Sequence, residues 1–143
     1  MEERRLRAKA AVVAQRRNGM VQVKRAYQPA SQNDGARFLV ERLWPRGIRK
    51  DSLHLDDWLK EVAPSTALRQ WFQHDPAKWN QFRRRYFHEL EKHPEAWAPL
   101  LAQAQNGRIT LVYSAHDTER NSAVALKEFL ETKCNAPSGG ESL

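Results

Sequence analysis

One ten-residue stretch decides the fold: Phe38-Leu39-Val40-Glu41-Arg42-Leu43-Trp44-Pro45-Arg46-Gly47. Its apolar residues form a run of strand length that two charged residues interrupt, which is typical of a buried β-strand. Pro45 removes a backbone donor and biases Trp44 away from helix, whereas Gly47 permits a turn with positive φ. The stretch therefore predicts a buried strand that ends in a rigid turn between Arg42 and Arg46.

The residues of this turn suit an anion, and two of them also have a structural alternative. Guanidinium groups make forked contacts with carboxylate or phosphate, and Trp44 offers a flat face beside Arg42 and Arg46. In an open α/β sheet, ligands bind at the carboxyl ends of the strands. Arg42 could instead pair with a neighbouring acid, and for Trp44 a packed position in the core is preferred. Arg46, next to the turn glycine Gly47, is expected to serve the ligand.

The remaining chain predicts elements in the order strand, strand, several helices, strand, helix. A strand is expected over residues 20–27, and Ser65 and Asp75 are placed to cap two helices, the second of which is strongly amphipathic. A β-branched strand over 108–113 precedes a last helix over 119–132. Because a long helical crossover joins the second and third strands, the sequence predicts a small single α/β domain. Its sheet should be largely parallel, with three to four helices.

Both ends of the chain differ in composition from this domain. Residues 1–19 hold six basic and two acidic residues, a net +4 of the chain's +7, and predict an arm that is disordered or helical on an anionic surface. Residues 134–143 are rich in Gly, Ser and Pro and predict a disordered tail. The folded domain is therefore expected at 20–133, with one short element of undecided type at 57–62.

Composition and motifs argue against several classes of protein. No apolar run reaches membrane-spanning length, and no signal-peptide apolar region is present. The single cysteine, Cys134, cannot form an internal disulfide and fits a reducing, cytoplasmic compartment. The P-loop, the dinucleotide-binding glycine fingerprint and the Gly-x-Ser-x-Gly elbow are absent, and the five histidines lack zinc spacing. We therefore expect neither a metal nor a cofactor.

The carboxyl ends of two strands are expected to meet in one cleft. Tyr113 ends the last strand, His116 follows in the loop, and Asn121 lies in the first turn of the next helix. If the strands are neighbours, these residues join the arginine turn, and the helix N-terminus adds a positive dipole that favours an anion. His116 is the one proton carrier expected there, or else an exposed loop histidine, and Asn121 could equally cap its helix.

Two further polar groups lie outside the turn. Ser65, Arg69, His74 and Asp75 could form a polar patch in the same cleft, although Ser65 suits a helix cap equally well. The run Arg83-Arg84-Arg85, together with the basic arm, is an alternative site for a nucleic acid. Such runs more often form solvated helix faces.

Several motifs recur in a characteristic order: Leu43-Trp44-Pro45-Arg46-Gly47, Trp58-Leu59-Lys60, Ala63-Pro64-Ser65, Leu68-Arg69, Trp71-Phe72, His74-Asp75, Phe82-Arg83, Tyr86, Glu89-Leu90, Thr110-Leu111, Tyr113 and Asn121. Over about residues 20–131 the chain thereby resembles the YeaO-like branch of the bacterial domain of unknown function 488. This resemblance implies a compact α/β domain in the bacterial cytoplasm and no established reaction.

The resemblance also implies that reactive groups are missing. Many members of the wider family carry a cysteine and a glutamate after the last strand, and Cys-His-Arg at the start of the last helix. Here the corresponding positions are Tyr113, Ala115 and Asn121-Ser122-Ala123, so thiol chemistry is not carried over. Glu41 stands where the family pattern leads us to expect Asp.

Three functions are consistent with the sequence. The preferred one is a pocket for a small anionic ligand, a nucleotide or a phosphate, at the strand ends; whether it carries out a reaction stays open. Its expected ligand-binding residues are Arg42, Trp44, Arg46, Gly47, Tyr113 and Asn121. The alternatives are the nucleic-acid-associated module and a non-enzymatic interaction protein, whose oligomeric state the sequence leaves open.

Overall fold

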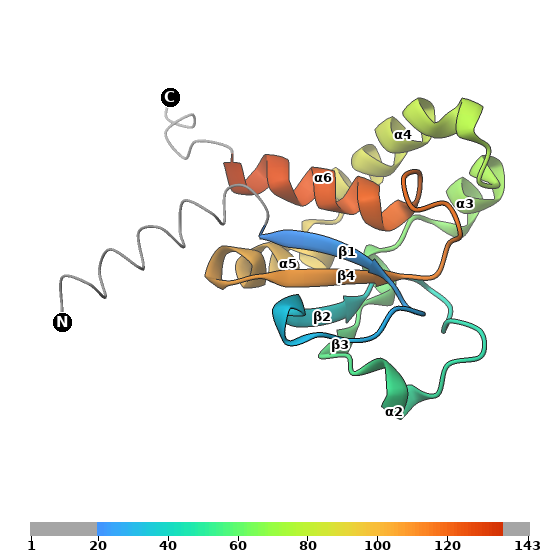
Figure 1. The fold of residues 1–143 in the computed structure, drawn as a ribbon. Coiled ribbons are helices and arrows are strands. Elements are labelled where there is room, and N and C mark those ends of the chain that lie inside the picture. The colour runs from blue at the N-terminus through green and yellow to red at the C-terminus, as the bar shows by residue number, and fades with distance from the viewer. Residues whose placement is uncertain (1–19, 136–143) are drawn as a thin grey trace, which may run out of the picture.

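The computed structural model describes residues 20–135, which form four strands, five α-helices and three short 3-10 helices (Figure 1). The strands are β1 (Val21–Arg25), β2 (Ala36–Leu39), β3 (Asp57–Trp58) and β4 (Ile109–Tyr113). The helices are α2 (Lys50–Leu53), α3 (Thr66–Phe72), α4 (Trp79–Lys92), α5 (Pro94–Asn106) and α6 (Ser122–Asn135), with 3-10 helices η1 (Gln32–Asp34), η2 (Lys60–Val62) and η3 (Pro76–Lys78). The expected arm at 1–19 and the expected tail from 136 onward lie outside the described residues.

The four strands form one parallel sheet in the order β1-β4-β2-β3. In the centre, β4 pairs with β1 through Val21 and Ile109 and with β2 through Phe38 and Leu111. The single α/β domain with a parallel sheet and a helical crossover is thus confirmed. The described residues contain five helices rather than three to four, because Lys50–Leu53 forms a helical turn where the sequence has no regular period.

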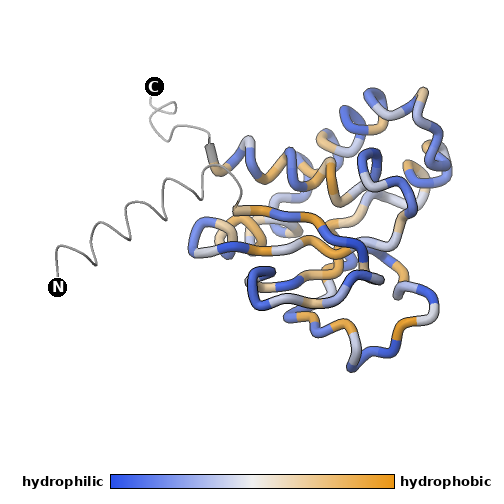
Figure 2. Tube along the Cα trace, viewed as in Figure 1, coloured by the Kyte–Doolittle hydropathy of each residue, from blue (hydrophilic) through white to orange (hydrophobic). Residues whose placement is uncertain are grey.

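Apolar residues cover both faces of the sheet, which explains why the strands read as near-continuous hydrophobic runs. On one face Leu111 and its neighbours pack against α3, α4, α5 and α6. On the other face Leu39 and Val112 pack against Leu53 of α2 and the segment that precedes it. Figure 2 shows the hydrophobic residues along the central strand, whereas most residues of α4 are hydrophilic.

The strand β2 ends at Leu39, earlier than the apolar run predicts. The Val40 N–H still donates to the Val112 carbonyl at 3.2 Å, but the chain then turns across the end of the sheet. There Trp44 packs edge-on against Trp58, with ring centroids 5.4 Å apart, and its Nε1 donates to the Ile48 carbonyl at 2.6 Å. Trp44 therefore lies in the turn after the strand and not in the strand itself.

The structure also resolves one undecided element and moves one predicted boundary. The undecided element at 57–62 contains β3, which pairs with β2 as an edge strand, followed by η2. The expected tail begins too early, because α6 continues to Asn135 and Cys134 packs against the core. No helix within residues 20–135 is long and apolar enough to cross a membrane.

Candidate functional site

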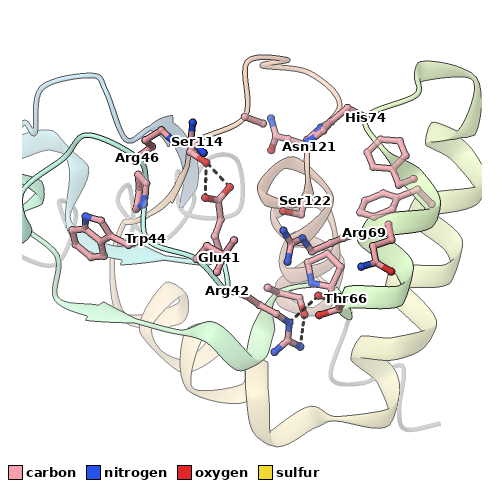
Figure 3. A pocket seen from close by; sticks show the side chains of 18 of the residues that line it. Glu41, Arg42, Trp44, Arg46, Thr66, Arg69, His74, Ser114, Asn121 and Ser122 are labelled. Carbon is pink, nitrogen blue, oxygen red and sulfur yellow. Dashed lines mark hydrogen bonds between the residues drawn. The ribbon is translucent and has the colours of Figure 1, made fainter.

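A cleft of about 460 Å³ opens where β2 and β4 end, between the arginine turn and α3 (Figure 3). Its walls come from segments far apart in the sequence: the turn after β2, the first turns of α3 and α6, and the loop after β4. The polar lining residues are Tyr27, Glu41, Arg42, Trp44, Arg46, Thr66, Arg69, Gln70, His74, Ser114, Asn121 and Ser122. Phe72 and Phe82 form part of its apolar wall.

The cleft brings together residues from both predicted groups. From the main group Arg42, Trp44, Arg46 and Asn121 line it, and from the second group Arg69 and His74 do. It does not include Gly47, Tyr113, His116, Ser65 or Asp75. The pairing of β2 with β4, which the prediction required, is what makes the turn and the loop neighbours.

Arg42 holds the turn to the segment before α3. Its Nε donates to the Pro64 carbonyl at 3.1 Å, and its Nη2 lies 3.5 Å from the Ala63 carbonyl (Figure 3). The structural alternative for this residue was an ion pair with a neighbouring acid, and no carboxylate in the described part of the chain pairs with Arg42. Its position is therefore fixed by neutral backbone oxygens, which leaves its positive charge uncompensated.

Arg46 and Arg69 lie on the walls with exposed side chains. Neither guanidinium pairs with a carboxylate within residues 20–135. The backbone of Arg46 is nevertheless anchored, because the Tyr27 hydroxyl donates to its carbonyl at 2.9 Å. The two side chains are thus free to meet a ligand on a backbone that is held in place.

Asn121 is buried, with 2% of its surface exposed, and caps α6. Its Oδ1 accepts from the Val124 N–H at 2.9 Å, and its Nδ2 donates to the Asp117 carbonyl at 2.8 Å. The backbone N–H groups of Glu119 and Arg120 hold the pKa of Asp117 below its ordinary value. These contacts fix the loop between β4 and α6 and favour the capping alternative for Asn121.

The other residues expected in the main site lie beside the cleft. Burial raises the pKa of Tyr113 despite the opposing effect of Arg25 and Asn121, so its phenol stays protonated at neutral pH. His116 is exposed on the loop and does not line the cleft. Gly47 has a φ of 82°, as the turn requires, and its role there is conformational.

Ser65 and Asp75 act as helix caps. Ser65 accepts from the Leu68 N–H at 3.1 Å and donates to Oε2 of Glu89 at 2.5 Å, which ties α3 to α4. Asp75 accepts from the Ala77 N–H at 3.0 Å at the start of η3. The second polar group is therefore divided, and only its two members on or next to α3, Arg69 and His74, line the cleft.

The sequence placed Ser114 at the end of the last strand but did not predict that it contacts Glu41. The Ser114 hydroxyl donates to one oxygen of Glu41 at 2.7 Å, and the Ser114 N–H donates to the other at 3.0 Å (Figure 3). Both residues lie near the carboxyl ends of their strands, Glu41 two residues after β2 and Ser114 directly after β4. This bridge keeps the Glu41 carboxylate turned toward the end of β4 and satisfies part of its hydrogen-bonding capacity.

The charges of the cleft favour an anion. Three arginines and one glutamate line it, a net +2 with His74 neutral, and the N-terminus of the 14-residue helix α6 opens beside them. Among residues 20–135, no group of three His, Cys, Asp or Glu side chains is placed to hold a metal ion. Hydroxyl groups of Thr66, Ser114 and Ser122 add neutral hydrogen-bond donors and acceptors to the walls.

Comparison with known proteins places the chain in a family. Its residues 20–142 match the family described as the inactive DUF488-N3 subclade. The chain is 45% identical over 112 residues to the uncharacterized protein YeaO of Escherichia coli, an alignment that covers 78% of this chain and 97% of YeaO. Uncharacterized proteins of Mycobacterium bovis and Mycobacterium tuberculosis are 38% identical over 114 residues, which cover 80% of this chain and 96% of each relative. No solved structure matches, and the sequence comparisons show that the chain belongs to the DUF488-N3i family, in the YeaO-like branch of the DUF488 proteins.

Proposed function

We propose that the protein is a non-catalytic binding protein whose cleft holds a small anionic ligand that carries a phosphate or carboxylate group. The observation that carries this proposal is the convergence of Arg42, Arg46 and Arg69 on one cleft with a single carboxylate, Glu41. Guanidinium groups bind such anions through paired N–H donors, and the cleft lies where open α/β sheets bind ligands.

The volume and shape of the cleft suit a ligand of metabolite size. Ligand pockets are typically about 300–1,000 Å³ in volume, and this cleft has about 460 Å³. The turn residues Leu43 and Trp44 line it on one side and Phe72 lines it on the other, so an apolar part of the ligand would find contacts. A nucleotide or a phosphorylated metabolite combines these features.

The chemistry of the cleft supports binding rather than catalysis. No cysteine lines it, and Asn121 and Ser122 occupy positions where the wider family carries cysteine and histidine. The matching subclade is described as inactive, which agrees with this loss. His74 is the histidine on the walls, but it lies exposed with a φ of 56° and is not hydrogen-bonded to a nucleophile in the described structure.

The test compares ligand-induced thermal stabilisation of the intact protein and two variants. Inorganic phosphate and a panel of nucleoside monophosphates, at constant ionic strength, should raise the Tm of the intact protein, because a ligand at a hundred times its Kd stabilises by about 2.7 kcal/mol. Arg46→Ala should abolish this rise while the ligand-free Tm stays the same, since its side chain is exposed. Arg49→Ala, an exposed arginine outside the cleft, is the matched control and should respond like the intact protein. Equal responses of all three proteins would contradict the proposal.

A further inference from the structure

The basic run at 83–85 divides between two surfaces of α4. Arg83 forms an ion pair with Glu128 of α6 and is thereby held between the helices. Arg84 and Arg85 are exposed, and neither pairs with a carboxylate within residues 20–135. The run is therefore not one continuous face, and only part of it is available to a partner.

The exposed part belongs to a longer surface, which we call the α4 basic face: Lys78, Gln81, Arg84, Arg85, His88 and Lys92. Positions 81, 85, 88 and 92 are three or four residues apart, so these side chains follow one side of α4, and Lys78 precedes them at the end of η3. Glu89 and Glu91 border this face, but Glu89 accepts from Ser65 and Glu91 pairs with Lys133 at 3.0 Å. Within residues 20–135, no carboxylate forms an ion pair with a cation of this face.

Trp71 of α3 holds two of these cations in place. The Arg85 guanidinium lies 4.1 Å from the centre of the Trp71 ring, and the Lys78 Nζ lies 5.0 Å from it. The Lys78 Nζ also donates to the Trp71 carbonyl at 2.8 Å. A guanidinium stacked on an aromatic ring keeps its N–H edges free for an oxygen anion, so the side chain is ordered before a ligand arrives.

We propose that the α4 basic face binds the sugar–phosphate backbone of a nucleic acid. A row of unpaired cations at regular spacing matches a polymer that carries one negative charge per nucleotide. A helix that lies in a membrane surface would need large apolar side chains on its lipid-facing side. The exposed large apolar residues of the described chain are Tyr27 and Leu43, which line the cleft instead.

This site is separate from the cleft. None of the six residues of the face lines the cleft, and two of them contact Trp71 of α3, which does not line it either. The two proposals can therefore fail independently. Arg46→Ala should lose stabilisation by phosphate yet keep nucleic-acid binding, and a variant of the face should do the reverse.

The experiment measures fluorescence anisotropy of labelled single-stranded RNA and of duplex DNA of equal length, titrated with the full-length protein at several salt concentrations. Arg84→Glu/Arg85→Glu should weaken binding by about tenfold or more. It should also lower the slope of log K against log salt by roughly two, one for each lost phosphate contact. The two probes show whether the backbone is bound in single strands or in duplex.

The matched control is Arg49→Glu/Lys50→Glu, which changes the net charge equally at two exposed cations of the α2 region, on the other side of the sheet. This control should bind within about twofold of the intact protein, because it leaves the α4 basic face and the basic residues of 1–19 unchanged. Arg84→Gln/Arg85→Gln, checked for an unchanged Tm, separates the loss of contacts from charge repulsion and from unfolding. Equal losses in both charge-reversal variants would overturn the proposal. So would binding to phosphatidylserine vesicles without binding to either oligonucleotide.

Discussion

At the scale of single residues, the most consequential charge is Asp34, which is 3% exposed at the end of η1. Burial alone would raise its pKa. Hydrogen bonds from Lys24, the Ser31 N–H and Arg37 outweigh that effect and hold the pKa below its ordinary value. A carboxyl group whose pKa is lower in the folded state stabilises the fold above its unfolded pKa and loses this contribution as pH falls.

We therefore expect Asp34→Asn to lower the free energy of unfolding at pH 7 by about 3 kcal/mol, because Arg37 loses its buried partner. The difference from the intact protein should shrink as pH falls below the ordinary carboxyl pKa of about 3.9, because Asp34 of the unfolded chain becomes protonated there while the folded carboxyl is still charged. Urea unfolding at a series of pH values measures this convergence. Asp51→Asn, at an exposed carboxylate, is the control and should change little at any pH. A difference that persists to the lowest pH would show that the charge is not the cause.

The role of a single residue could be predicted from the sequence where the groups that it contacts are close in the chain. Ser65 and Asp75 cap the helices that their spacing predicts, and Gly47 has the predicted positive φ. Glu41 and Ser114, by contrast, are 73 residues apart and meet because β2 and β4 are neighbours. A long-range hydrogen bond leaves no local pattern, so this bridge required the structure.

At the scale of elements, helix α6 controls the loop that closes the cleft. Asn121→Ala removes the acceptor for the Val124 N–H and the donor to the Asp117 carbonyl, so it should cost about 1–2 kcal/mol of stability. Asn121→Asp keeps the capping acceptor but places a negative charge against the Asp117 carbonyl. Its stability should therefore lie between that of the intact protein and that of Asn121→Ala. Guanidinium unfolding measures both changes. Unchanged stability of Asn121→Ala, together with loss of phosphate binding, would instead identify Asn121 as a ligand contact.

Long periodic elements were predictable and short ones were not. The amphipathic pattern of α4 and the β-branched run of β4 identify these elements directly. The edge strand β3 has two residues, Asp57 and Trp58, and exists because it pairs with β2. Nothing in so short a segment distinguishes a strand from a loop, so β3 follows from tertiary contacts alone.

At the scale of the whole molecule, the parallel sheet explains why the sequence predicted the position of the cleft. It does not predict all of the residues that line the cleft. Parallel strands place all their carboxyl ends at one edge, which predicts that the turn and the loop after β4 meet there. The third wall comes from α3, whose orientation depends on its packing against α4 through Phe72, Phe82 and Trp79. Such packing has no signature in the sequence, so the sequence alone could not show that Arg69 and His74 line the same cleft as Arg46.

A further prediction for the whole molecule concerns the removal of the basic segment at 1–19. The E. coli relative is covered over 97% of its length by 112 residues of this chain, and the family match begins at residue 20. Removal of residues 1–19 should therefore leave a single cooperative unfolding transition, with a Tm within about 2 °C of the full-length value. Differential scanning calorimetry measures this.

The truncated protein should also keep the response of the cleft to phosphate, since Arg42, Arg46 and Arg69 all remain in it. Its affinity for nucleic acid should fall together with the salt slope, because up to six cations are removed. The effect of Arg84→Glu/Arg85→Glu should nevertheless persist in the truncated protein. A large drop in Tm would instead mean that the segment packs on the domain and belongs to its fold. Loss of the Arg84 and Arg85 effect would mean that the segment, rather than the α4 basic face, is the nucleic-acid contact.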